Sequence, residues 1–123
     1  MWSTSPTTQW EKDRKYYEKK HPRELAAVLN NLGRYIDLLN RSKKAACAEA
    51  GYLHGEGAGV VAIDQKAGGK SLQETRMYIF ANEAEKVLYL ITIGNKDSQH
   101  DDVLYSRDFV KEHFPPPEQT KPD

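Results

Sequence analysis

Two apolar segments joined by a short polar connection limit most strongly what this chain can fold into. The segments QETRMYIFA (residues 73–81) and KVLYLITIG (residues 86–94) flank the tetrapeptide NEAE. Both are rich in β-branched and aromatic residues, which favour strands, and so short a connection joins antiparallel neighbours. A third run, GAGVVAIDQK (residues 57–66), precedes them and is followed by a turn at AGGK (residues 67–70). The pattern therefore predicts an antiparallel meander of three strands.

Helical periodicity dominates the N-terminal part of the chain. Thr8 and Glu11 fit a capping box that opens a polar helix over QWEKDRKYYEKK. Trp10 and Tyr17 are the expected buried contacts of this helix. Pro22 suits the first turn of a second helix. The second helix carries one apolar stripe at three- and four-residue steps, formed by Leu25, Val28, Leu29, Leu32, Ile36 and Leu39.

Two further helices are expected. The segment KKAACAEA (residues 43–50) fits a short helix closed by Gly51. Asp97 or Ser98 can cap a last helix that runs to about His113, where the following prolines stop it. The order of helices, strands and one final helix predicts an α+β domain, with N-terminal helices packed on a small antiparallel β-sheet.

Length and composition fit a single domain. The chain has 123 residues, of which 38% are hydrophobic and 29% are charged, and a chain of this length builds one core. We expect one domain over residues 8–114, between a disordered N-terminus at residues 1–7 and a disordered tail at residues 115–123. No run reaches the roughly 18 apolar residues that span a bilayer, and the N-terminus lacks the pattern of a secretory signal. A cytoplasmic protein without membrane contact is expected.

The distribution of charge argues against a general nucleic-acid footprint. The formal net charge is zero. Residues 1–50 hold 10 Lys and Arg against 6 Asp and Glu, a net +4, and residues 51–123 hold 8 against 12, a net −4. Any contact with RNA would therefore be local, or would use the surface of a larger assembly.

Alternation along the second predicted strand separates two sets of side chains. Arg76, Tyr78 and Phe80 share one face of the sheet, and Met77 and Ile79 share the other. Because one strong amphipathic helix covers one face, the opposite face is expected to stay partly open.

The open face would carry polar chemistry. A guanidinium from Arg76, a phenol from Tyr78 and an ammonium from Lys96 would suit a phosphate-binding surface. The structural alternative is that Arg76 pairs with Glu74 or Glu85 while the ring of Tyr78 is half-buried.

Searches for other sites give no positive result. The segment LHGEGAG has glycines but lacks the GxxxxGK[ST] pattern of a phosphate-binding loop, and is expected to be a flexible lead-in to a strand. His100 with Asp101 and Asp102 fits the first turn of a helix better than a metal site. Cys47 is expected to be a small packed residue, and as the one cysteine it rules out an internal disulfide. No spacing of the histidines indicates a metal site, and no cofactor is expected.

Three segments together resemble a known family. LHGEGAGVVAIDQK, ETRMYIF and VLYLITIGNKDSQHDDVLYSRDFV resemble the RelE/HigB-like toxins of bacterial type II toxin–antitoxin systems, in the RelE/ParE superfamily. The resemblance covers roughly residues 22–113. Its most specific parts are the strand with R-x-Y and the segment IGNKDSQHDD before the last helix. It implies a RelE-like fold, a cognate antitoxin, the ribosome and mRNA as partners, and either a homodimer or a toxin–antitoxin hetero-oligomer.

The resemblance also implies a reaction. Many such toxins cut mRNA in the ribosomal A site without a metal, by attack of a ribose 2′-hydroxyl on the adjacent phosphate. The reaction needs a base for the hydroxyl, cations for the developing charge and an acid for the leaving 5′-oxygen.

By this resemblance, several residues receive roles. Arg76 would stabilise the transition-state charge and Lys96 would bind phosphate. Tyr78 or Tyr105 would stack on a base or lend a proton, and His54 would act as base. The residues expected to contact RNA are Lys66, Lys70, Gln99 and Arg107.

Two other functions stay open. The chain could act by binding alone, as a related branch of these toxins does when it inhibits DNA gyrase. It could also be a small interaction module unrelated to toxicity, in which Arg76 and Lys96 are ordinary surface residues.

Overall fold

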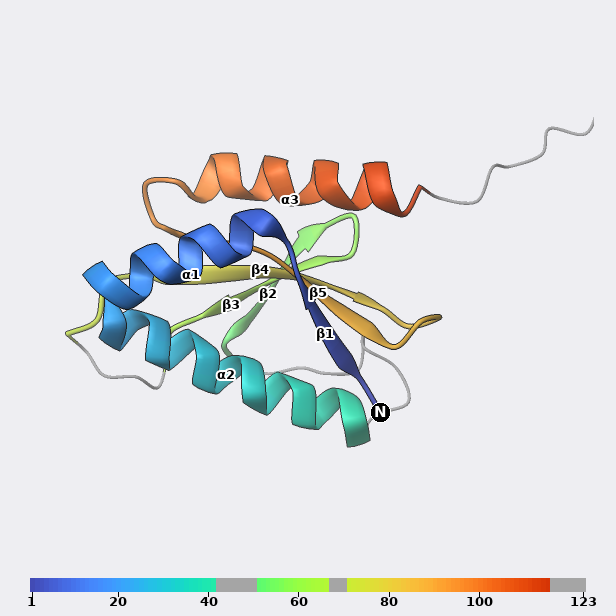
Figure 1. Ribbon diagram of the computed structural model, residues 1–123, viewed down its shortest axis with the longest axis horizontal. Coiled ribbons are helices and arrows are strands. Elements are labelled where there is room, and N and C mark those ends of the chain that lie inside the picture. The colour runs from blue at the N-terminus through green and yellow to red at the C-terminus, as the bar shows by residue number, and fades with distance from the viewer. Residues whose placement is uncertain (42–50, 67–70, 116–123) are drawn as a thin grey trace, which may run out of the picture.

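The computed structural model describes residues 1–41, 51–66 and 71–115. Within these ranges the chain forms an α+β fold, as the sequence predicts. One sheet with the strand order β1-β5-β4-β3-β2 lies between α3 on one face and α1 with α2 on the other (Figure 1). The elements are β1 (Ser3–Pro6), α1 (Thr8–Lys20), α2 (Pro22–Arg41), β2 (Leu53–Gly57), β3 (Val60–Asp64), β4 (Thr75–Asn82), β5 (Val87–Asn95) and α3 (Gln99–His113).

The sheet contains the predicted meander and has one additional strand at each edge. Strands β3, β4 and β5 are antiparallel neighbours, as expected. At one edge, β2 pairs antiparallel with β3, and at the other β1 pairs parallel with β5, so the sheet is mixed. The prediction of three antiparallel strands was therefore incomplete.

Strand β1 replaces the disordered N-terminus that was expected at residues 1–7. Its sequence STSP has no apolar alternation, so its strand conformation comes from pairing with β5. The backbone N–H of Ser3 donates to the carbonyl of Lys86 at 3.0 Å, and that of Thr7 donates to the carbonyl of Leu90 at 2.9 Å. The ring of Trp2 is buried in the core and anchors the start of this strand.

Strand β2 forms a tight hairpin with β3, where a flexible lead-in was expected. Gly57, Ala58 and Gly59 all have positive φ, which closes the turn. A Cβ atom on Gly59 would approach the Phe80 ring to 2.8 Å, so this position requires glycine for packing as well as for backbone conformation.

The N-cap of helix α1 lies one residue before the predicted cap, so the helix begins at Thr8 itself. The Thr7 hydroxyl accepts the backbone N–H of Trp10 at 3.0 Å and donates to the carbonyl of Ile91 at 2.7 Å. Because this hydroxyl meets both the helix end and β5, Thr7 and not Thr8 is the N-cap. Trp10 and Tyr17 are buried, as predicted.

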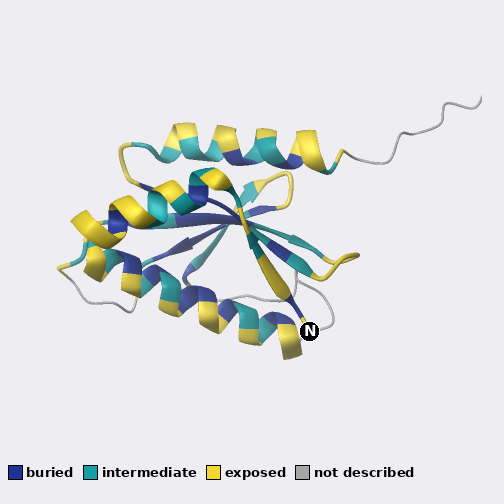
Figure 2. Cartoon of the chain, in the orientation of Figure 1, coloured by how far each residue is buried: buried dark blue, intermediate teal, exposed yellow. Residues whose placement is uncertain are grey.

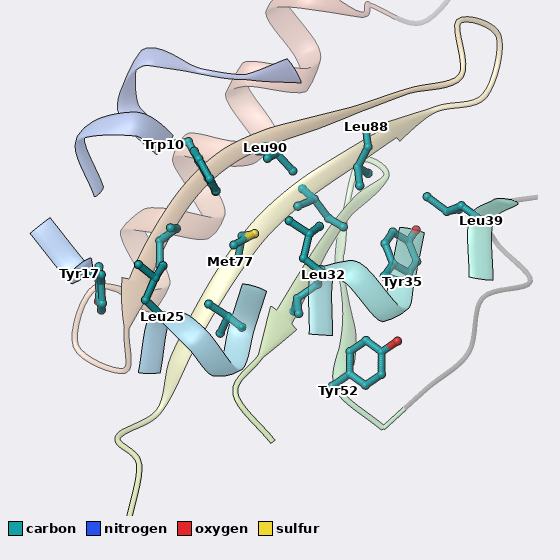
Figure 3. Packing of buried hydrophobic residues seen from close by; sticks show 14 of the residues in the cluster. Trp10, Tyr17, Leu25, Leu32, Tyr35, Leu39, Tyr52, Met77, Leu88 and Leu90 are labelled. Atoms are coloured by element: carbon teal, nitrogen blue, oxygen red, sulfur yellow. The ribbon is translucent and has the colours of Figure 1, made fainter. Parts of the chain in front are cut away.

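The apolar stripe of α2 forms one side of the larger core. Leu25, Val28, Leu32 and Leu39 are buried, and Leu29 and Ile36 pack at its margin. In Figure 3 the side chains of Leu25 and Leu32 lie in one cluster with Met77, Leu88 and Leu90 of the sheet. Figure 2 shows that burial is concentrated on the inner sides of the helices and along the central strands.

Helix α3 covers the sheet face that was expected to stay partly open. A second core cluster lies beneath it, formed by Val60, Ala62, Tyr78, Ile91 and Val110. The bounds of α3 agree with the prediction, and Ser98 occupies its N-cap position. The last helix thus uses an apolar contact, around Val110, that the sequence pattern did not reveal.

Several predictions lie outside the described residues. They are the helix at residues 43–50 with Cys47, the turn at 67–70 with Lys70, and residues 116–123 of the tail. Across the described ranges, no helix is long and apolar enough to cross a membrane.

Candidate functional site

Three strands bring charged side chains together at one end of the sheet, on the α3 face. Strand pairing places Asp64 opposite Arg76 and Arg76 opposite Gly94. His54 pairs with Ala62, two residues before Asp64, so its side chain lies diagonally across from that carboxylate. We call this set the strand-end cluster; its members are His54, Glu56, Asp64, Lys66, Glu74 and Arg76.

A histidine–aspartate pair contains the most buried side chain of the strand-end cluster. The Nε2 atom of His54 lies 2.6 Å from Oδ2 of Asp64. The Asp64 side chain is 3% exposed, whereas that of His54 is 28% exposed and can meet a ligand. A buried carboxylate that holds one ring nitrogen fixes the tautomer and orientation of the imidazole, which is the arrangement that general base catalysis uses.

Lys66 completes the surroundings of the Asp64 carboxylate. Its backbone N–H donates to Oδ1 at 2.8 Å, and its Nζ lies 3.8 Å from Oδ2. The Lys66 side chain is 66% exposed, so its ammonium is available to a ligand beside the imidazole.

Arg76 is held between two carboxylates. Its Nη1 lies 3.2 Å from Oε1 of Glu56, and its Nη2 lies 3.3 Å from Oε1 of Glu74. Glu74 is one of the two partners considered from the sequence. The other, Glu85, instead accepts hydrogen bonds from Asn82 and Tyr89. The strand-end cluster therefore sets three carboxylates against the cations of Lys66 and Arg76, and is not a bare cationic surface.

Tyr78 is fully buried, not half-buried. Its Oη has no hydrogen-bond partner among the described residues. Burial raises the pKa of its phenol, the Asp102 carboxylate raises it further, and Arg76 opposes that effect. In this conformation the ring supports α3 and does not present a face to a nucleotide base.

Tyr105 lines a groove between α1, β5 and α3 with a volume of about 390 Å³, and Arg76 is not part of its lining. The groove is lined by Asp13, Asp101 and Asp102 and by the aromatic rings of Tyr16, Tyr17 and Tyr105. Burial raises the pKa of the Asp102 carboxyl, the hydrogen bond from Ser98 lowers it, and the Asp13 and Asp101 carboxylates raise it.

The remaining predicted contacts are spread over the same face. Lys96 is exposed in the turn after β5, and Gln99 is the first residue of α3. The Arg107 guanidinium lies against Gly57 at the β2–β3 hairpin. The structure therefore unites His54, Lys66 and Arg76. It places Tyr105 in the groove with Asp101 and Asp102, and Arg107 beside the hairpin that carries Glu56.

Two members of the site were missed in the sequence. Asp64 ends an otherwise apolar strand, and a charged residue in such a run is a signal that could have marked it. Glu56 has no comparable signal, because its contact with Arg76 depends on the β2–β3 hairpin and the irregularity in pairing at Gly55–Gly57.

Among the described residues, no group of three or more His, Cys, Asp or Glu side chains is arranged to hold a metal ion. Comparisons with protein-family models, with curated proteins and with solved structures found no match.

Proposed function

We propose that this protein is the toxin of a type II toxin–antitoxin system and a ribosome-dependent mRNA interferase of the cytoplasm. The observation that carries the proposal is the His54–Asp64 pair, with Nε2 and Oδ2 2.6 Å apart, beside the exposed ammonium of Lys66. It agrees with the resemblance to RelE/HigB-like toxins in the strands that hold these residues.

The proposed chemistry depends on the direction of the hydrogen bond between His54 and Asp64. With Nε2–H donated to Asp64, the Nδ1 lone pair of His54 accepts the proton of a ribose 2′-hydroxyl. The 2′-oxygen forms a bond to the adjacent phosphorus, and the bond from phosphorus to the 5′-oxygen breaks. Lys66 passes a proton to the leaving 5′-oxygen, and the products carry a 2′,3′-cyclic phosphate and a 5′-hydroxyl.

Arg76 would act after an exchange of partners. A phosphate can take the place of Glu56 or Glu74 on the guanidinium fork, because phosphate and carboxylate bind that fork in the same bidentate manner. Neutralising charge on the pentacoordinate phosphorus is the role we propose for Arg76.

A second candidate function is action by binding alone, on gyrase or another target. The specific observation in its favour is that Arg76 is already paired with two carboxylates while Tyr78 is buried. In that case the strand-end cluster would serve the stability of the sheet.

Inducible expression in a bacterial host separates these candidates. We expect the wild type to arrest growth and to produce mRNA fragments with 5′-hydroxyl ends. His54→Gln should lower cleavage by about 10²–10⁴-fold, the usual contribution of a general base, with the fold retained. Arg76→Ala should also lose activity, whereas Lys19→Ala, at an exposed position on α1, should cut like the wild type.

Each alternative predicts a different pattern. Growth arrest with intact mRNA and DNA damage would favour gyrase inhibition. Full cleavage by His54→Gln would remove His54 from the site, and normal growth with a folded wild-type protein would contradict the toxin proposal.

A further inference from the structure

A buried asparagine on α2 holds the backbone of the strand-end cluster from the opposite side of the sheet. Asn31 is 1% exposed and follows the buried Val28 by one turn of the helix. A buried amide costs free energy unless its donors and acceptor are paired, so a polar residue at this place calls for specific partners.

Both donors of the Asn31 amide are used on one short segment. Nδ2 donates to the carbonyl of Asp64 at 2.8 Å and to the carbonyl of Lys66 at 2.9 Å. The Oδ1 atom accepts from Nη1 of Arg34 at 3.4 Å. The two carbonyls flank Gln65, where the chain leaves β3, so the amide fixes the backbone on both sides of this exit.

The fixed segment is the one that orients His54. Oδ1 of Asp64 accepts the Lys66 backbone N–H, and Oδ2 contacts the imidazole and the Lys66 ammonium. A rotation of the Asp64 or Lys66 peptide would therefore move the Asp64 carboxylate. The His54 imidazole and the Lys66 ammonium, which meet the ligand, would move with it.

We propose that Asn31 is a positioning residue for the His54–Asp64–Lys66 arrangement. It touches no substrate and acts through the backbone of β3. The proposal rests on the proposed ribonuclease function for its effect on rate, but its effect on the geometry of His54 is independent of that function.

The test compares Asn31→Leu with two matched variants. Asn31→Leu removes both donors while keeping a side chain of similar volume. Asn30→Leu makes the same chemical change at the exposed neighbouring position. Leu32→Ala weakens the core from the next residue of α2, with an apolar side chain that makes no hydrogen bond to Asp64 or Lys66.

Two properties are measured at a temperature where every variant is folded. One is the single-turnover rate of mRNA cleavage on programmed ribosomes, and the other is the NMR spectrum of the His54 ring with the exchange rate of the Lys66 amide. Asn31→Leu should lower the rate by about 10²-fold, the usual effect of misplacing a catalytic group, and should speed exchange of the Lys66 amide. Asn30→Leu and Leu32→Ala should keep the wild-type ring spectrum.

The outcomes separate the two proposals. If the wild type cleaves no mRNA, the ribonuclease proposal fails, and the His54 and Lys66 spectra still decide the role of Asn31. If Asn31→Leu has the ring spectrum and amide exchange of the wild type, the positioning role is overturned.

A measurement on the wild type keeps the inference testable if Asn31→Leu does not fold. Scalar couplings across the hydrogen bonds from Asn31 Nδ2 to the carbonyl carbons of Asp64 and Lys66 should be detectable, and their absence would overturn the inference. Asn31→Ser, which keeps one donor, should lie between the wild type and Asn31→Leu in amide exchange; exchange as in the wild type would count against the role.

Discussion

At the scale of single residues, close contacts on the α3 face decide which side chains the site can hold. Gly94 lies opposite Arg76 in the sheet, directly beneath the start of α3. A Cβ atom at this position would overlap the Asp102 carboxylate and the Ser98 hydroxyl. Glycine thus allows α3 to begin close to the strand-end cluster.

Gly94→Ala should destabilise the protein by about 1–3 kcal/mol, the usual cost of overpacking a filled site. Chemical denaturation monitored by circular dichroism measures this change. Gly33→Ala is the control, because a Cβ atom there meets nothing within 4 Å and should stabilise α2 by about 0.5–1 kcal/mol. Equal effects of the two changes would contradict the contact with Asp102.

A second residue-scale prediction concerns the carboxylates on Arg76. Glu56→Gln leaves one acidic partner on the guanidinium, so the affinity of the cluster for inorganic phosphate should rise. NMR titration with phosphate measures this affinity, with Glu85→Gln as a control outside the cluster. An unchanged affinity would show that Glu56 does not compete with phosphate for Arg76.

At the scale of elements, the edge strand β1 and the start of helix α1 depend on partners that lie far away in the sequence. Strand β1 and the N-cap of α1 are both held by β5, 84 residues later in the chain. The strong periodic patterns, those of α2 and of the three central strands, were correct in type. Their extent was nearly correct except in β3, which spans Val60–Asp64 where a strand over residues 57–66 was predicted. The weak patterns at the edges were misjudged because pairing, and not composition, stabilises them.

The cap of α1 gives a direct test at this scale. Thr7→Ala should cost about 1 kcal/mol of stability, since it removes an N-cap and the bond to the Ile91 carbonyl. Thr8→Ala, at the exposed neighbouring position, should change stability little. Thermal unfolding of the two variants compares them, and a larger loss for Thr8→Ala would restore the cap predicted from the sequence.

At the scale of the whole molecule, both sheet faces are covered and tyrosines are buried among the layers. Burial raises the pKa of Tyr17 and of Tyr35 to about 12 each. A group whose folded pKa is raised favours its protonated form in the folded state. Its contribution to stability is complete below the unfolded pKa of about 10 and is lost as the pH rises to about 12.

The protein should therefore lose stability between about pH 10 and pH 12. Denaturant midpoints measured across this window test the expectation. Tyr17→Phe and Tyr35→Phe should each flatten the decline, because the substituted position no longer ionises. Tyr105→Phe, at an exposed position, serves as control.

By itself, the sequence determined the α+β class, the apolar stripe of α2, the central meander and the extent of α3. The first three follow from local periodicity, and the extent of α3 follows from its capping residue and the prolines after it, all of which a short window of the chain displays. The alternation of the strand marked Arg76 as a candidate, and the resemblance to RelE/HigB-like toxins added His54 and Lys66. Only the tertiary structure decided that Asp64 orients His54, that Glu56 and Glu74 pair with Arg76, and that α3 buries Tyr78. These contacts join residues of different strands and helices, and their distances are set by register, hairpin geometry and packing, which no local pattern encodes.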